Sequence, residues 1–389
     1  MYDHILQHRL GQDCDPWLQT REALLSILQW VTMTSHELGI AMARKATSQD
    51  VADRAQVSRS AVSFVLNGRA DGNIAKDKQK RILAAAKELN YTPNAVARSL
   101  QSQRTHTIGV VTDSIAGGAF AGKLLQGANN AAFAAGYLLL VIDTQGDEIR
   151  EDKAFLTLLN RQVDAMVFAT MSLRAHSPHS AMGSVPSVLA NCFDPAGTFR
   201  SIIPDEVSGG RTAVQTLLNA GHRQIAYLSG SGELIATERR TQGVTEALSA
   251  AGLPPAATTV TGWEINDGFH AAMRLFNTGA KPTRGVFQPT GIVCANDRVA
   301  MGVLLACGQL GLRIPQDVSI VGYDDDEPLA RTAVPGLTTV ALPHSEMGEK
   351  AIELLCQDLD RGISTEHGEP IMMECPVVIR GSVAPPAAR

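Results

Sequence analysis

The sequence predicts an α/β protein in which an N-terminal all-α module precedes two lobes built on parallel sheets. Short helical segments with clear start and stop signals occupy the chain from residue 42 to about 104. From Thr107 onward, apolar strand-like runs alternate with helix-length stretches, which is the pattern of right-handed βαβ units. In a chain of 389 residues this alternation is long enough for two sheet-centred lobes rather than one.

The N-terminal module has a helix-turn-helix pattern. Thr47 is followed three residues later by Asp50, which resembles a capping box and predicts a helix start. A turn is expected at Gln56-Val57, after which Ser58 can cap a second helix that ends at Asn67-Gly68. Two helices joined by so short a turn are typical of DNA-binding modules.

Two further helices are expected in this part of the chain. The first runs from about Asp77 to Leu89, and the second, short one from Asn94 to Leu100 follows the Ncap and N1 pair Thr92-Pro93. The side chains expected to face the core of the module are Val51, Ala55, Val62, Leu66, Ile82, Ala86 and Leu89.

Eight strands are expected beyond Arg104. They are Ile108 to Val111, Tyr137 to Ile142, Ala165 to Ala169, Val185 to Ala190, Ile225 to Leu228, Thr258 to Val260, Ile292 to Ala295 and Val318 to Val321. Ligands of open parallel sheets bind outside the carboxyl ends of the strands, so polar residues there are candidate ligand contacts. Such residues are Asn191, Asn296 and Asp324, whereas Asp297 is expected to cap the following helix.

Charge is distributed unevenly along the chain. The net charge is -5, yet twelve Lys and Arg residues face only five acidic residues between Arg44 and Arg104. A basic segment on an acidic body is expected of a module that contacts nucleic acid phosphates. The six cysteines have no paired spacing, no signal peptide is visible, and no apolar run is long enough to span a membrane. We therefore expect a cytoplasmic protein without membrane contact.

Several segments resemble the lactose-repressor (LacI/GalR) family of transcriptional regulators. The stretch TSQDVADRAQVSRSAVSFVLNG, Thr47 to Gly68, resembles the family's headpiece, and YTPNAVARSL, Tyr91 to Leu100, resembles its hinge helix. The likeness continues in NAGHRQIAYLSG, CANDRVAMG, RIPQDVSIVGYDDD and PGLTTVALPHSEMG, and covers residues 44 to 383. The resemblance implies a repressor with a helix-turn-helix headpiece and a two-lobed, periplasmic-binding-protein-like sensor.

The resemblance also implies a division into domains. Residues 1–41 form an extension of unknown role, 42–91 the headpiece, 92–104 the hinge helix and linker, and 105–389 the sensor. Within the sensor, the N-lobe takes about residues 105–203 and 343–372, and the C-lobe about 204–342 and 373–389. Because Met42 opens a natural start for a family headpiece, we expect residues 1–41 to be dispensable for DNA binding.

The expected partners are an operator of pseudo-palindromic double-stranded DNA, a small-molecule effector and a second copy of the chain. The family's base-reading positions fall on Arg59, Ser60 and Phe64, where arginine can bind a guanine edge and phenylalanine only a thymine methyl. Leu100 matches the position that wedges into the minor groove. The full set of expected DNA contacts is Thr47, Ser58, Arg59, Ser60, Ser63, Phe64, Asn67, Asn94, Ala97, Arg98 and Leu100.

The effector is expected to be a sugar. The matching pocket positions are Phe120, Asn191, Arg240, Trp263, Asn296 and Asp324. Amide, guanidinium and carboxylate groups suit hydroxyls, while aromatic rings offer flat faces to sugar C–H groups. Effector identity, the direction of its effect, operator sequence and dimer versus tetramer stay open, although VAPPAAR after Ser382 lacks a zipper heptad.

Other classes of function are less well supported by the sequence. LSGSG, Leu228 to Gly232, is not a dinucleotide fingerprint because Ile235 stands where glycine is needed. No phosphate-binding loop, nucleophile elbow or metal-ligand spacing is visible, so we expect no enzyme activity, no metal and no cofactor. A transport-type sugar-binding protein would share the two lobes, but it would lack the headpiece and would carry a signal peptide.

Overall fold

The computed structural model describes residues 45–92, 99, 104–114, 119–232, 234–254, 256–276, 288–362 and 368–387. The chain divides into two compact units between Ala97 and Arg98. Residues 1–41 and most of the expected hinge helix lie outside the described residues, and so do the predictions made for them.

The N-terminal unit contains α3 (Ser48–Ala55), α4 (Arg59–Leu66) and α5 (Lys76–Glu88) around one small core. Thr47 and Asp50 form the predicted capping box, and Ser58 accepts a hydrogen bond from the backbone N–H of Ala61. The predicted helix-turn-helix is therefore confirmed. Leu66 and Leu89 pack against this core as expected but are only partly buried, and Val65, which was not expected in the core, is buried.

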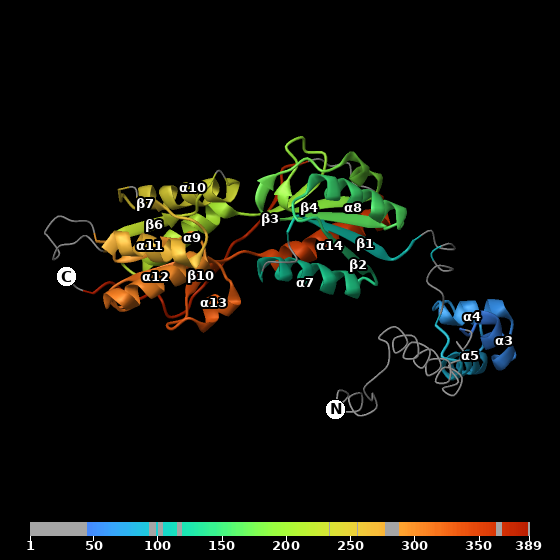
Figure 1. The fold of residues 1–389 in the computed structure, drawn as a ribbon. Helices are drawn as coiled ribbons and strands as arrows, with labels where there is room; N and C mark the ends of the chain where they lie inside the picture. The colour runs from blue at the N-terminus through green and yellow to red at the C-terminus, as the bar shows by residue number, and fades with distance from the viewer. Residues whose placement is uncertain are drawn as a thin grey trace, which may run out of the picture. The chain divides into compact units, whose positions relative to one another are not determined.

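The second unit contains two six-stranded sheets with corresponding strand orders. Figure 1 shows the helices and strands that build the two lobes around them. The first sheet has the order β11-β5-β4-β3-β1-β2, and all of its described pairs are parallel. Its strands are β1 (Thr107–Thr112), β2 (Leu138–Asp143), β3 (Ala165–Ala175), β4 (Ser187–Phe193), β5 (Arg200–Pro204) and β11 (Ile371–Met373).

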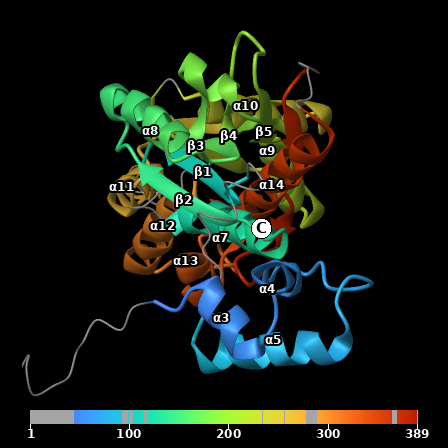
Figure 2. The same cartoon turned by 90° about the vertical axis from the view of Figure 1, so that its right-hand side faces the viewer.

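Helices cover both faces of this first sheet. The helices α7 (Ala119–Ala134) and α14 (His344–Arg361) pack side by side on one face, as Figure 2 also shows, and α8 (Glu148–Asn160) packs on the other. A short 3-10 helix, Ser180–Ser184, precedes β4. The two faces explain the almost continuous apolar runs in β1 and β4, because both sides of a parallel sheet are buried.

The second sheet has the order β12-β10-β9-β8-β6-β7, in which only the described pair β10-β12 is antiparallel. Its strands are β6 (Ile225–Ser229), β7 (Ala257–Val260), β8 (Gly291–Cys294), β9 (Ser319–Asp324), β10 (Thr338–Ala341) and β12 (Val377–Val378). One face is covered by α9 (Glu206–Asn219) and α10 (Ile235–Ala250), the other by α11 (Ile265–Phe276) and α12 (Asp297–Leu310). The helix α13 (Glu327–Thr332) follows β9.

The predicted α/β architecture with two parallel-sheet lobes is confirmed, and all eight predicted strands are present. The sequence reading missed β5, β10, β11 and β12. The last two have only three and two residues, too few to show a period, and β10 contains buried threonines whose polarity hides its place in the sheet.

The chain passes between the two lobes at three places. It does so between β5 and α9, between β10 and α14, and between β11 and β12. Glu206 opens α9 directly after the first passage, and His344 opens α14 directly after the second. Side chains from these passages therefore lie at the junction of the lobes.

Candidate DNA-reading helix and effector site

The second helix of the N-terminal unit presents its predicted reading side chains to solvent. Arg59, Ser60, Ser63 and Phe64 are all exposed, and 41% of Phe64 is accessible although it is a large apolar side chain. The opposite face of α4 packs into the core through Ala61, Val62 and Val65. The helix thus has one face free for a groove of DNA and one face fixed to the protein.

Hydrogen bonds position the ends of this reading surface. Arg59 Nε donates to Ser48 Oγ at 3.0 Å, which draws its guanidinium toward the start of α3. Asn67 Nδ2 donates to Ser63 Oγ at 3.1 Å. The hydroxyls of Thr47 and Ser58, both predicted DNA contacts, cap α3 and α4, so each has a structural role. Asn94, Ala97, Arg98 and Leu100 lie outside the described residues.

The polar residues predicted for the effector gather mainly in the second lobe. Arg240, on α10, is 6% exposed, and its guanidinium carbon lies 3.8 Å from the ring centroid of Tyr323. Its Nη1 donates to the backbone oxygen of Ala295 at 2.7 Å, and its Nη2 lies 3.6 Å from Asp324 Oδ1. Residues from the ends of β8 and β9 therefore meet one guanidinium.

A residue that the sequence reading did not select contributes most to this cluster. Glu206 forms a bidentate ion pair with Arg240, with its Oε2 2.6 Å from Nε and its Oε1 2.9 Å from Nη2. Only 2% of Glu206 is exposed. Glutamate is common at the first position of a helix, so the sequence held no signal that Glu206 pairs with an arginine. Arg240 is also 34 residues away in the chain.

Asp324 has an unusual acidity in this environment. The pKa of Asp324 is raised from its usual range to about 7, above all by burial; Arg240 lowers it, and Glu206 and Asp326 add to the rise. Burial lowers the pKa of Arg240, but the ion pair with Glu206 raises it, and the pKa of Arg240 lies well above its usual value. At neutral pH the Asp324 carboxyl can therefore donate as well as accept a hydrogen bond.

The helix that follows β8 is capped by a different residue from the one predicted. Asn296, not Asp297, is the N-cap of α12, and its Oδ1 accepts from the backbone N–H of Val299 at 2.8 Å. Asp297 lies fully buried inside the helix and accepts from the backbone N–H of Asp326 and from Thr339 Oγ1. The prediction failed because either residue type caps well and only the backbone conformation decides between them.

Asn296 also joins the aromatic part of the site. Its Nδ2 donates to the backbone oxygen of Trp263 at 3.1 Å, while Trp263 Nε1 donates to the backbone oxygen of Ser231. A Cβ on Gly230 would lie 2.2 Å from Trp263 Cζ2, so only glycine lets the indole lie against this backbone. Both polar atoms of the Asn296 side chain are used within the protein, which favours a positioning role.

The first lobe contributes Asn191. This residue lies within β4 rather than after its end, which corrects the predicted strand boundary. Its φ is 59°, and the pairing of β3 with β4 shifts register across it, between Ala190 and Cys192. Its Nδ2 donates to the backbone oxygens of Thr170 and Met171. No contact in the described residues joins Asn191 to Arg240 or Asp324; for Phe120 only the backbone, in α7, is described.

A lysine bridges the two lobes beside this site. Lys123 Nζ, on α7, donates to the backbone oxygen of Asp325 at 2.8 Å and lies 3.9 Å from its carboxylate. The same carboxylate accepts from Arg380 Nη2 at 2.7 Å. Because α7 belongs to the first lobe and Asp325 follows β9, this contact joins the two lobes one residue from Asp324.

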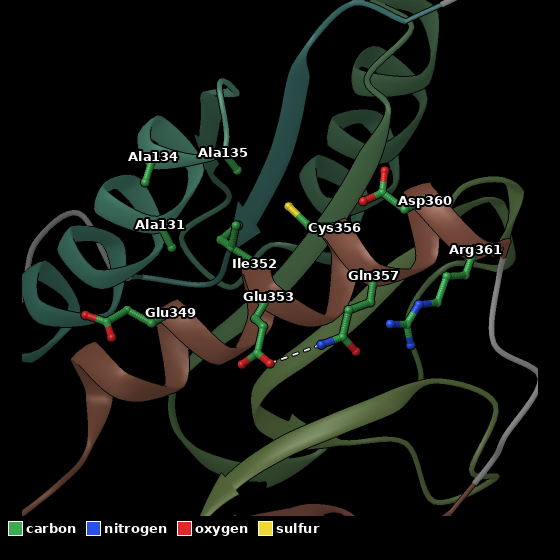
Figure 3. A pocket seen from close by; sticks show the side chains of 10 residues that line it. All are labelled: Ala131, Ala134, Ala135, Glu349, Ile352, Glu353, Cys356, Gln357, Asp360 and Arg361. Atoms are coloured by element: carbon green, nitrogen blue, oxygen red, sulfur yellow. Dashed lines mark hydrogen bonds between the residues drawn. The ribbon is translucent and has the colours of Figure 1, made fainter.

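A groove on the outer side of the first lobe is a poorer candidate for the effector. It has a volume of about 450 Å³ and lies between α7 and α14, as Figure 3 shows. Alanines form one wall, and Glu353 and Gln357 on the other wall bond each other. None of the residues predicted for the effector lines this groove.

Two family models match separate parts of the chain. Residues 47–94 match the model described as bacterial regulatory proteins, lacI family, and residues 214–383 match a periplasmic binding protein-like domain. The chain is 35% identical over 338 residues to the ribose operon repressor of Escherichia coli strain K12, which covers 85% of this chain and 98% of that protein. The chain belongs to the lacI family.

Other members of the lacI family give the same picture. The transcriptional repressor PurR of Vibrio vulnificus is 33% identical over 344 residues, covering 87% of this chain and 98% of that protein. The solved lac repressor dimer bound to operator and an anti-inducer is 27% identical, with a TM-score of 0.71, and covers 88% of this chain and all of that one. The predicted helix-turn-helix regulator is thus confirmed as a DNA-binding regulator of this family.

Membership of the lacI family places the described surfaces in context. The matched regulatory segment contains α3, α4 and α5, and the matched binding-protein segment contains Arg240, Trp263, Asn296 and Asp324. In the part of the chain that the structure describes, no helix is long and apolar enough to cross a membrane.

Proposed function

We propose that this lacI-family regulator is a homodimer that reads a pseudo-palindromic operator through α4 and is controlled by a sugar. The effector site consists of Arg240, Asp324, Trp263 and Asn296 together with Asn191 and Phe120 of the first lobe. The observation that carries the sugar assignment is the pair formed by Arg240 Nη2 and Asp324 Oδ1, 3.6 Å apart where the strands end. A guanidinium and a carboxyl side by side offer donors and acceptors to adjacent hydroxyls.

The relatives support both parts of this proposal. One relative of 35% identity is named a ribose operon repressor, and a solved complex of the regulator CelR with cellobiose is 25% identical with a TM-score of 0.59. The lac repressor structure of 27% identity is a dimer on its operator. A dimer of identical headpieces fits an operator whose two halves are related by symmetry.

The DNA contacts are proposed at Arg59, Ser60, Ser63, Phe64 and Asn67 on and after α4. Thr47 and Ser58 are proposed to add backbone contacts at the helix starts, where N–H groups can approach phosphates. Hinge residues complete the proposed set: Asn94, Ala97, Arg98 and Leu100. The relatives of 33 and 35% identity are repressors, which supports a regulator without catalytic activity.

The effector part is tested by thermal unfolding of the full chain with D-ribose as the probe. A ligand that binds only the folded state raises the melting temperature with its concentration. We expect a rise for the wild type and none for Asp324→Ala, whose melting temperature without ligand should not fall. Unfolding of Asp324→Ala in the absence of ligand would instead assign that carboxyl to the core.

The DNA part is tested with an operator obtained by selection from random duplexes. We expect a near-palindrome bound by two chains, with an affinity that falls steeply as salt is raised. Selection of an asymmetric site bound by one chain would contradict the proposed dimer.

A further inference from the structure

We infer that Glu206 sets the charge preference of the effector site, so that the site takes a neutral polyol and rejects an anionic ligand such as a phosphorylated sugar. This inference rests on the proposed effector site and names the chemical class that the site selects. Glu206 acts through Arg240 and is a positioning and specificity-determining residue rather than a ligand contact.

The pairing of Arg240 is the first argument. An arginine in a ligand site commonly serves as a fork for carboxylate or phosphate. Here a carboxylate of the protein itself already occupies that fork, because Glu206 accepts hydrogen bonds from Nε and Nη2 of Arg240 at 2.6 and 2.9 Å. The positive charge is therefore balanced before any ligand arrives, and an anion would have to compete with a carboxylate that is only 2% exposed.

The donors that remain on Arg240 are the second argument. A guanidinium has five N–H groups, and three of them serve Glu206 and Ala295. The others lie on Nη1 and on the Nη2 that faces Asp324. A ligand therefore meets one or two N–H donors beside a carboxyl, and the positive charge of the guanidinium is already paired. These groups match hydroxyl groups and not a phosphate.

The neighbouring charges are the third argument. Lys123 and Arg380 share the single carboxylate of Asp325, so one positive charge of this group is left for other carboxylates to offset. Arg298 lies 3.1 Å from Glu264. Asp324 and Asp326 are nearly buried and can add only negative charge. The described charges around Asp324 thus sum to zero or below, and in a poorly hydrated site this repels an anion.

The position of Glu206 at the start of α9 also stabilises its carboxylate. It is the first residue of α9, where the helix N-terminus stabilises a negative charge, and its neighbour Asp205 caps the helix. The ring of Tyr323 also packs against the guanidinium of Arg240. The carboxylate is therefore fixed by elements of the second lobe alone, and its effect does not depend on closure of the two lobes.

The test compares D-ribose with D-ribose 5-phosphate by calorimetric titration and thermal unfolding of the full chain at matched ionic strength. For the wild type we expect the phosphate ester to bind about tenfold more weakly or worse, as one repelled charge in a partly buried site implies. In Glu206→Gln, which keeps the shape and removes the charge, the ratio of the two Kd values should shift toward the ester by about tenfold or more. Glu246→Gln is the matched control, because Glu246 pairs with Arg211 at 2.7 Å on the surface of the same two helices.

Inorganic phosphate provides an arm that does not depend on the identity of the sugar. It should raise the melting temperature of Glu206→Gln above that seen with sodium chloride, and the added change Arg240→Met should abolish the rise. Equal responses of the wild type and Glu206→Gln to phosphate, or equal binding of ribose and its phosphate ester by the wild type, would overturn the inference.

The two proposals fail in different ways. If neither sugar binds the wild type, the ribose-type effector is wrong, and the phosphate arm still decides the role of Glu206. If Glu206→Gln does not fold, Glu206→Asp should keep the wild-type preference for the neutral sugar, and loss of that preference would contradict a role of the charge.

Discussion

Two arginines of this regulator have opposite surroundings. Arg59 is exposed on α4 and donates to a serine hydroxyl, and in the part of the chain that the structure describes no ion pair involves it. Arg240 is 6% exposed and is held by Glu206, Ala295 and Tyr323. The charge of the first is exposed, as the proposed contact with DNA requires, whereas the charge of the second is paired inside the protein. Under the proposed function, the same residue type would serve an electrostatic role in one unit and a geometric one in the other.

The largest expected difference between the two arginines concerns stability. Arg240→Met leaves the Glu206 carboxylate buried without its partner, which should lower the free energy of unfolding by about 3 to 5 kcal/mol. Urea denaturation of the full chain measures this loss. Arg211→Met is the control, because Arg211 also pairs with a glutamate but is half exposed, and its denaturation midpoint should not change measurably. Equal losses for both variants would mean that burial of the pair does not matter.

The second expected effect concerns DNA. Arg59→Ala should weaken binding to the selected operator by roughly 1 to 3 kcal/mol and binding to random DNA much less, with no change in stability. Arg54→Ala is a matched control on the same unit, since Arg54 pairs with Glu88 at 2.8 Å and is not on α4. Titrations on both DNAs measure the ratio. A loss of the same size on operator and random DNA would reduce Arg59 to a phosphate contact.

A third effect separates the two buried groups at the lobe junction by pH. The folded-state pKa of Asp324 is raised to about 7 by burial, so its contribution to stability falls as pH rises from about 4 to 7. The pKa of His344 is lowered to about 4, also by burial, so its contribution rises from pH 4 to 6.5. Each slope is at most about 1.4 kcal/mol per pH unit.

Two variants isolate these slopes. Relative to the wild type, Asp324→Asn should gain stability as pH rises from about 4 to 7, and His344→Leu should lose it between about 4 and 6.5. Urea midpoints of the full chain at several pH values measure both. Parallel curves for the wild type and Asp324→Asn would show that this carboxyl has an ordinary acidity.

The smallest expected effect concerns Phe64, the exposed aromatic residue of α4. Its ring offers only an apolar contact to a thymine methyl, so Phe64→Ala should weaken operator binding less than Arg59→Ala does. Replacing single thymines of the operator by deoxyuridine removes one methyl at a time. We expect one such replacement to weaken the wild type and to leave Phe64→Ala unaffected; a wild type indifferent to every replacement would contradict the contact.

The sequence alone determined the elements whose signals are local. The capping box at Thr47 and Asp50, the cap at Ser58 and the stop at Asn67-Gly68 lie within a few residues of the helices they bound, and all of them are present in the structure. Alternating apolar runs predicted the parallel sheets for the same reason. Where two neighbouring residues can play one role, as Asn296 and Asp297 can at the start of α12, the sequence could not choose between them.

Only the tertiary structure decided the electrostatics of the proposed effector site. The sequence predicted Arg240 and Asp324, but the partner that sets their charge, Glu206, lies 34 residues before Arg240 and opens a different helix. The raised pKa of Asp324 likewise depends on its burial at the end of β9 and on the charges of Glu206 and Arg240, which belong to α9 and α10. Composition and spacing report which charges a chain carries, whereas their pairing and hydration depend on distances that exist only after folding.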